Sequence, residues 1–149
     1  MEICAVGIAD SKEAAMERSE DVYFSLGGMF FVYDKVKQEI NIKKHGISFR
    51  VAARVFFDED YIEALDEDNE SGEIRFDVIG DISVAGRLEE KTVIGNVEKF
   101  AGADKDILYV VYTERTRRNL DGKEEEVIRL ISARMATDFE RGLYYGKAY

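Results

Sequence analysis

The sequence has few of the residues that bind metals or cross-link chains. Among its 149 residues it contains one cysteine, Cys4, and one histidine, His45, and it has no proline and no tryptophan. A single cysteine excludes an internal disulfide bond, and one cysteine with one histidine cannot build a zinc site of thiolates and imidazoles within one chain. We therefore predict no metal, no cofactor and a reducing, cytoplasmic environment.

The sequence also lacks long hydrophobic runs and the common phosphate-binding loops. Its first apolar run, residues 3–9, is far shorter than the roughly 18 residues of a membrane span, so neither a secretory signal nor a membrane contact is expected. Glycine-rich nucleotide motifs and the GxSxG elbow are absent. The acidic turn at residues 66–72 has its glycine seventh, whereas an EF-hand calcium loop needs it sixth.

The charge is unevenly distributed along the chain. The 31 acidic and 21 basic residues give a net charge of −10. Residues 1–29 and 61–77 together hold the whole acidic excess, whereas residues 30–60 and 108–149 each carry a slight positive charge. Because salt screens charges over about 8 Å, the local balance matters more than the total. The charge therefore neither implies nor excludes a nucleic acid ligand.

The first half of the sequence predicts helices. We interpret residues 1–28 as an N-terminal extension that ends in a glycine joint. Asp34 is a suitable cap for a helix that stops at Gly46. Ser48 can cap a second helix, because apolar residues recur after it at intervals of three to four.

The second half predicts strands. Four are expected, at residues 61–65, 74–79, 107–112 and 127–134. Residues 107–112 are apolar throughout, which is typical of a central strand. Thr137 and Glu140 form a capping box for a last short helix. The predicted fold class is α+β, with two N-terminal helices packed on an antiparallel sheet and a short C-terminal helix.

Four side chains are candidates for chemistry on phosphates. His45 ends the first predicted helix, where its charge can serve structure alone or carry a proton near a phosphate. Arg75, Arg129 and Arg134 are either solvated strand residues or phosphate contacts. Arg129 and Arg134 are five positions apart, so a regular strand directs them to opposite faces unless a bulge intervenes.

Several short segments together resemble a known family. The first helix contains Asp34-Lys35-Val36-Lys37, Asn41 and Lys44-His45-Gly46. Glu73-Ile74-Arg75, Gly86-Arg87-Leu88, Val110-Val111-Tyr112-Thr113-Glu114-Arg115 and Ile128-Arg129-Leu130-Ile131-Ser132-Ala133-Arg134 follow. Their order resembles the BrnT-type toxins (DUF497), whose first helix reads Asp-Pro-x-Lys-x-x-x-Asn-x-x-Lys-His-Gly. Lys35 replaces the proline, and residues 89–106 look like an insertion into a BrnT-like domain at residues 29–149.

The resemblance implies a RelE-like fold and a metal-independent endoribonuclease that arrests translation. A ribbon-helix-helix antitoxin would neutralise the toxin, and only this antitoxin would bind DNA directly. Under this reading the catalytic residues are His45, Arg75 and Arg134, and the RNA-binding residues are Tyr33, Lys44 and Arg129. Glu73 or Glu140 is the remaining proton carrier. The alternative is a non-catalytic interaction module of the same fold, because the acidic extension would repel RNA.

Overall fold

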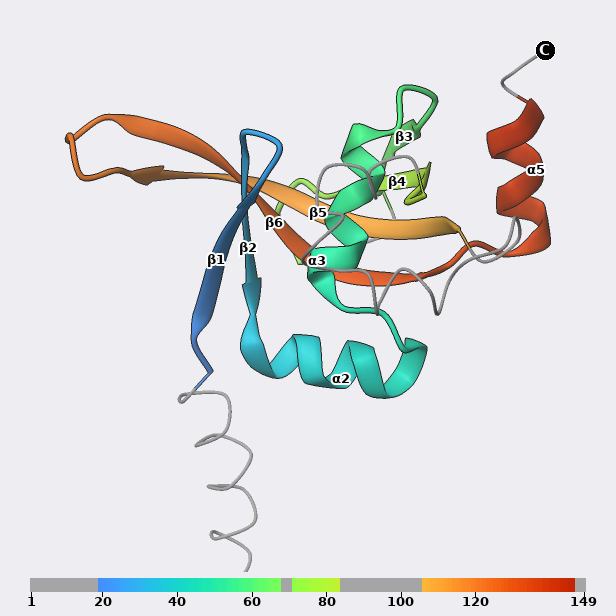
Figure 1. Cartoon of the computed structure of the whole chain (residues 1–149), viewed down its shortest axis with the longest axis horizontal. Coiled ribbons are helices and arrows are strands. Elements are labelled where there is room, and N and C mark those ends of the chain that lie inside the picture. Colours follow the sequence, from blue (N-terminus) through green and yellow to red (C-terminus); the bar gives the residue numbers. More distant parts are fainter. Residues whose placement is uncertain (1–18, 68–70, 84–105, 147–149) are drawn as a thin grey trace, which may run out of the picture.

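The computed structural model describes residues 19–67, 71–83 and 106–146 and contains a mixed six-stranded sheet. The strands are β1 (Asp21–Leu26), β2 (Met29–Asp34), β3 (Ile62–Leu65), β4 (Phe76–Asp81), β5 (Ile107–Arg118) and β6 (Glu124–Met135). Their order across the sheet is β1-β2-β6-β5-β4-β3, and all neighbours are antiparallel except β2 and β6 (Figure 1). The helical elements are α2 (Lys35–His45), α3 (Phe49–Ala52), the 3-10 helix η1 (Ala53–Phe57) and α5 (Asp138–Gly146).

The first helix has the two ends that the sequence predicts. The carboxylate of Asp34 accepts hydrogen bonds from the backbone N–H groups of Val36 and Lys37, at 2.8 and 3.3 Å. Gly46 ends the helix in the left-handed conformation, with φ of 71°. Both signals act locally, so sequence reasoning can find them.

One face of the sheet carries the main core, which α3, η1 and the segment before them cover. Its buried residues include Phe31, Ile47, Phe49, Val55, Val78, Leu108, Val110, Leu130 and Ala133. We call the opposite side the far face. The far face is partly covered by α5, where Ile79, Ile107, Ala136 and Tyr144 form a second, smaller cluster.

Strand β2 pairs with β6 only as far as Arg129, and helix α2 lies beside the part of β6 that follows. Asn41 is buried, and its side chain takes the place of a strand partner for Ala133. It donates to the carbonyl of Ala133 at 2.9 Å and accepts from the N–H of Ala133 at 3.1 Å. A further bond to the carbonyl of Ile47, at 2.9 Å, ties down the chain after the helix. One amide thus satisfies backbone groups that would otherwise be buried without partners.

The predicted architecture needs three corrections. A hairpin precedes the helices, because β1 pairs with β2 from Asp21 against Asp34 to Leu26 against Met29. The expected boundary at residue 28 therefore lies inside this hairpin. The sheet is not purely antiparallel, since β2 and β6 run parallel. The two N-terminal helices are in fact one helix of 11 residues and a four-residue turn that continues as η1. The predicted insertion at residues 89–106 lies almost entirely outside the described residues.

Candidate nucleic-acid interface

A bulge in β6 places Arg129 and Arg134 on the same face of the sheet. Arg129 pairs with Thr113 and Arg134 pairs with Tyr109, with a register shift between Val111 and Tyr112. Thr113 and Tyr109 are four positions apart in β5 and so share the far face. The extra residue in β6 changes the parity that a regular strand would give. About 13 Å of strand separates the two arginines.

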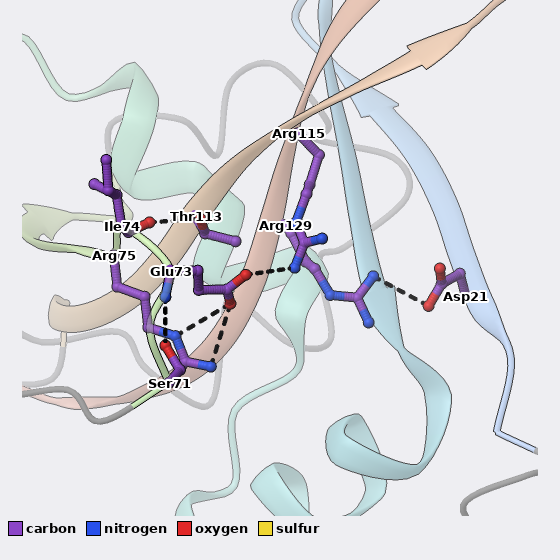
Figure 2. A network of polar contacts seen from close by, with 8 residues as sticks. All are labelled: Asp21, Ser71, Glu73, Ile74, Arg75, Thr113, Arg115 and Arg129. Carbon is purple, nitrogen blue, oxygen red and sulfur yellow. Dashed lines mark hydrogen bonds and ion pairs between the residues drawn. The ribbon is translucent and has the colours of Figure 1, made fainter.

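Glu73 lies between two arginines at this face (Figure 2). One carboxylate oxygen accepts from Arg75 Nε and Nη2, both at 3.3 Å, and the other accepts from Arg115 Nη2 at 2.8 Å. The hydroxyl of Thr113 donates to the carbonyl of Ile74 at 2.6 Å and fastens the loop to β5. The loop before β4 and strand β5 therefore hold one carboxylate and two guanidinium groups together.

Arg129 extends the group toward the first strand. Its Nη1 lies 3.1 Å from a carboxylate oxygen of Asp21 in β1. A hollow of about 170 Å³ is lined by Asp21, Tyr23, Val32, Arg115, Thr116, Arg117, Val127 and Arg129. We call Arg75, Arg115, Arg117 and Arg129 the arginine face. Among the described residues, its four cations are contacted by three carboxylates, those of Asp21, Glu73 and Glu125.

Sequence reasoning missed Arg115 and Arg117, although a signal was present. Both follow Thr113 at intervals of two in the long strand β5, so all three share one face. The prediction ended this strand at residue 112, before the arginines. Val32 and Val127 line the same hollow and are only 2% exposed.

Two of the ion pairs of the arginine face each have one side chain that is about half exposed. The side chain of Arg115 is 48% exposed, and that of Asp21 is 45% exposed. Solvent-exposed pairs of this kind typically contribute no more than about 1 kcal/mol to stability. A guanidinium binds phosphate through two parallel hydrogen bonds, so the exposed Arg115 has the chemistry to contact an external phosphate.

Arg134 belongs to a separate group at the end of the sheet near α5. Its Nη1 and Nη2 contact the two carboxylate oxygens of Glu140 at 2.7 and 2.9 Å, and its guanidinium lies 4.1 Å from the ring centre of Tyr109. The hydrogen bond from Arg134 lowers the pKa of Glu140. Burial raises the pKa of the neighbouring Asp77 carboxyl, which also interacts with Tyr109. This arginine is therefore held by a two-bond ion pair and a cation-π contact that are separate from the arginine face.

The remaining candidate residues lie elsewhere. His45 and Lys44 are exposed in the last turn of α2, and within the described residues no polar contact joins them to an arginine. Tyr33 is only 5% exposed, and its ring packs against Phe24 and Phe49 in the core. Tyr33 therefore offers no free ring face to a base, because β2 directs it to the helix-covered side.

The described residues contain no cluster of three or more His, Cys, Asp or Glu side chains arranged to hold a metal ion. In the same part of the chain, no helix is long and apolar enough to cross a membrane.

A comparison with protein families supports the predicted resemblance. Residues 33–89 match the family model of the ribonuclease toxin BrnT of type II toxin-antitoxin systems. The matched segment contains α2, β3, β4, Glu73 and Arg75, whereas Arg115 and Arg129 lie beyond it. No curated protein matches this chain. The family match thus confirms the resemblance over the segment that carries the first helix.

Proposed function

We propose, from the match of residues 33–89 to the BrnT ribonuclease toxins, that this protein is the toxin of a type II toxin-antitoxin pair. Its activity would be cleavage of RNA without a metal ion. That match carries the proposal, and the arginine face gives the RNA a place to bind. A RelE-like fold is part of the proposal, since the α+β sheet with a helix beside it is compatible with one.

The arrangement around Glu73 suits attack of a ribose 2′-hydroxyl on the adjacent phosphate. In this reaction the 2′-oxygen forms a bond to phosphorus, the bond from phosphorus to the 5′-oxygen breaks, and a cyclic phosphate and a 5′-hydroxyl result. A base must take the 2′-proton, cations must stabilise the phosphorane, and an acid must protonate the leaving oxygen. Glu73 would be the base, and Arg75 and Arg115 the stabilising cations. Arg129 would bind a neighbouring phosphate.

The acid that protonates the leaving oxygen has two candidates. Arg134 lowers the pKa of Glu140, so this carboxyl is ionised at neutral pH and is a poor proton donor. A protonated imidazole can donate such a proton, and His45 is the one histidine of the sequence. The roles of acid for His45 and phosphate contact for Lys44 therefore rest on the resemblance alone, since both residues lie in the last turn of α2, outside the arginine face. Arg134 then acts at the edge of the site, and its loss should slow cleavage less than loss of Arg75.

The family also implies an antitoxin partner. We propose that a ribbon-helix-helix antitoxin covers the arginine face and neutralises it, and that DNA is bound only through this partner. The second candidate function is a non-catalytic module that retains antitoxin binding. One observation favours this module: carboxylates of the chain itself already pair with the arginines. These negative charges lower the attraction of the surface for RNA.

Induced expression in a bacterial host tests the proposal. We expect growth arrest when the chain is expressed alone and normal growth when the neighbouring reading frame is expressed with it. The Glu73→Gln variant, expressed to the same level, is the matched control and should permit growth. Normal growth with the wild-type chain alone, together with a stable complex between the two proteins, would favour the non-catalytic module.

A further inference from the structure

Two aromatic side chains extend the arginine face beyond the catalytic residues proposed above. Tyr23 in β1 is opposite Val32, and Phe30 in β2 is opposite Ser25. Because Tyr23 and Ser25 are two positions apart, Tyr23 and Phe30 lie on one face of the hairpin. Val32 also pairs with Arg129, so this is the same face that carries the arginines. The β5–β6 hairpin projects past this hairpin (Figure 1).

Exposure separates these two rings from their neighbours. Tyr23 is 44% exposed and Phe30 is 38% exposed, whereas Phe24 and Phe31, which point to the other face, are 8% and 0% exposed. Packing in the core therefore explains Phe24 and Phe31 but does not explain Tyr23 and Phe30. Large exposed apolar side chains gathered on one surface are typical of a binding site.

Arg117 lies beside both rings. Its guanidinium carbon is 4.3 Å from the ring centre of Tyr23 and 5.7 Å from that of Phe30, which are distances of cation-π contacts. One hollow, described above, contains Tyr23 and Arg117 and leads to Arg129. A second, of about 500 Å³, contains Phe30 and Arg117 and leads to the tip of the β5–β6 hairpin. Arg117 is thus the residue that the two hollows share.

Alternating aromatic rings and guanidinium groups suit a single strand of nucleic acid. Its unpaired bases stack on rings and guanidinium planes, while its phosphates bind arginines. A duplex keeps its base faces inside and cannot use such a surface. We propose that Tyr23, Phe30 and Arg117 form a stacking platform for the bases of single-stranded RNA, which directs the next phosphates to Arg129 and Arg115. This inference rests on the proposed function.

Binding of a labelled single-stranded 2′-O-methyl RNA tests the platform, because this probe lacks the attacking hydroxyl and cannot be cleaved. Fluorescence anisotropy should show that Tyr23→Leu and Phe30→Leu each weaken binding about tenfold or more, which is the usual effect of losing one stacked base. Leucine keeps an apolar side chain at both positions. Tyr23→Phe keeps the ring and should bind like the wild type. A matched duplex should bind the wild type and both leucine variants with the same affinity.

Tyr145→Leu is the matched control, because Tyr145 is 47% exposed on α5 and far along the chain from the hairpin. It should leave probe binding unchanged. Equal affinity of the wild type and both leucine variants for the single strand would overturn the platform, even if the wild type cleaves RNA. Loss of antitoxin binding with unchanged RNA binding would also overturn it. A wild type that binds the probe through Tyr23 but cleaves no RNA would support the platform and refute the proposed activity.

Discussion

The carboxylate of Asp21 lies 3.1 Å from the guanidinium of Arg129, although the two residues are 108 positions apart in the sequence (Figure 2). The first strand thereby supplies a negative charge to a surface that gathers positive ones. Glu73 does the same for Arg75 and Arg115. The chain thus places its own carboxylates against Arg75, Arg115 and Arg129.

This pairing predicts that Asp21→Asn binds single-stranded RNA more tightly than the wild type. The substitution removes the competing charge and leaves Arg129 in place, so we expect a severalfold gain in affinity at low salt. The thermal midpoint should change by no more than a few degrees, because exposed ion pairs contribute little. Anisotropy titrations measure the gain, with Glu39→Gln, exposed in α2 and outside both hollows, as the control for net charge. An equal gain from both variants would show that Arg129 is not specifically released.

The position of α2 depends on the hydrogen bonds of Asn41. Variants at this residue should lose stability according to the hydrogen-bond partners that they leave unsatisfied. Asn41→Ala leaves buried backbone groups of Ala133 without partners and should cost about 2–4 kcal/mol in the free energy of unfolding. Asn41→Asp should cost more, because it places a carboxylate against two carbonyl oxygens. Urea unfolding monitored by circular dichroism measures both values. A smaller loss for aspartate than for alanine would contradict this account of the helix position.

The attachment of α5 depends on a hydrogen bond between Tyr144 and Asp58. The Tyr144 hydroxyl donates to Oδ2 of the buried Asp58 at 2.6 Å, and the N–H of Asp81 donates to the same oxygen at 2.8 Å. Tyr144→Phe should therefore cost about 1 kcal/mol in unfolding free energy, and Asp58→Ala roughly 3 kcal/mol. The exposed Tyr145 provides the control, since Tyr145→Phe should change the unfolding free energy by under about 0.5 kcal/mol. Equal stability of the two phenylalanine variants would show that this bond does not anchor α5.

The ion pair between Glu140 and Arg134 should contribute to stability in a pH-dependent way. Its bond to Arg134 lowers its pKa in the folded state, so the stabilisation is present above the unfolded-state pKa near 4.5 and is lost as pH falls through the folded value. Glu140→Gln should be less stable than the wild type at pH 7 and should approach it at pH 3. Urea unfolding at the two pH values measures the difference.

Asp77 serves as the comparison, because its pKa is shifted in the opposite direction to that of Glu140. Burial raises its pKa, so its ionised form destabilises the fold above the folded-state value. Asp77→Asn should therefore be more stable than the wild type at pH 7, and the gain should shrink at pH 3. A loss for Glu140→Gln that is the same at both pH values would show that its charge is not involved.

Local signals in the sequence predicted part of the fold correctly. The caps at Asp34, Ser48 and Thr137 need only neighbouring residues, and the structure contains each of them. The hairpin β1–β2 was missed even though residues 22–28 carry its signature, an alternating strand followed by two glycines. Gly27 and Gly28 both have positive φ, as a tight hairpin turn requires. The parallel pairing of β2 with β6 joins segments almost a hundred residues apart, and no local pattern reveals it.

The candidate site shows the same limit. The pairing of Arg129 with Asp21 depends on the position of the missed hairpin. The shared face of Arg129 and Arg134 depends on a bulge that strand periodicity alone does not reveal. The predicted stacking residue, Tyr33, lies in the core, and the parity of β2 that places it there becomes clear only when the partner strands are known.

Cleavage of a labelled single-stranded RNA by the purified protein in EDTA tests the central claim most directly. We predict that the wild type cleaves it and leaves a cyclic phosphate. Glu73→Gln, Arg75→Met and Arg115→Met should each be slower by about a hundredfold or more, with unchanged circular dichroism. Methionine keeps the apolar stem, and Arg50→Met, exposed in α3 and outside the arginine face, should cleave normally. Cleavage that survives in all three variants, or no cleavage by a wild type that binds its antitoxin tightly, would contradict the claim.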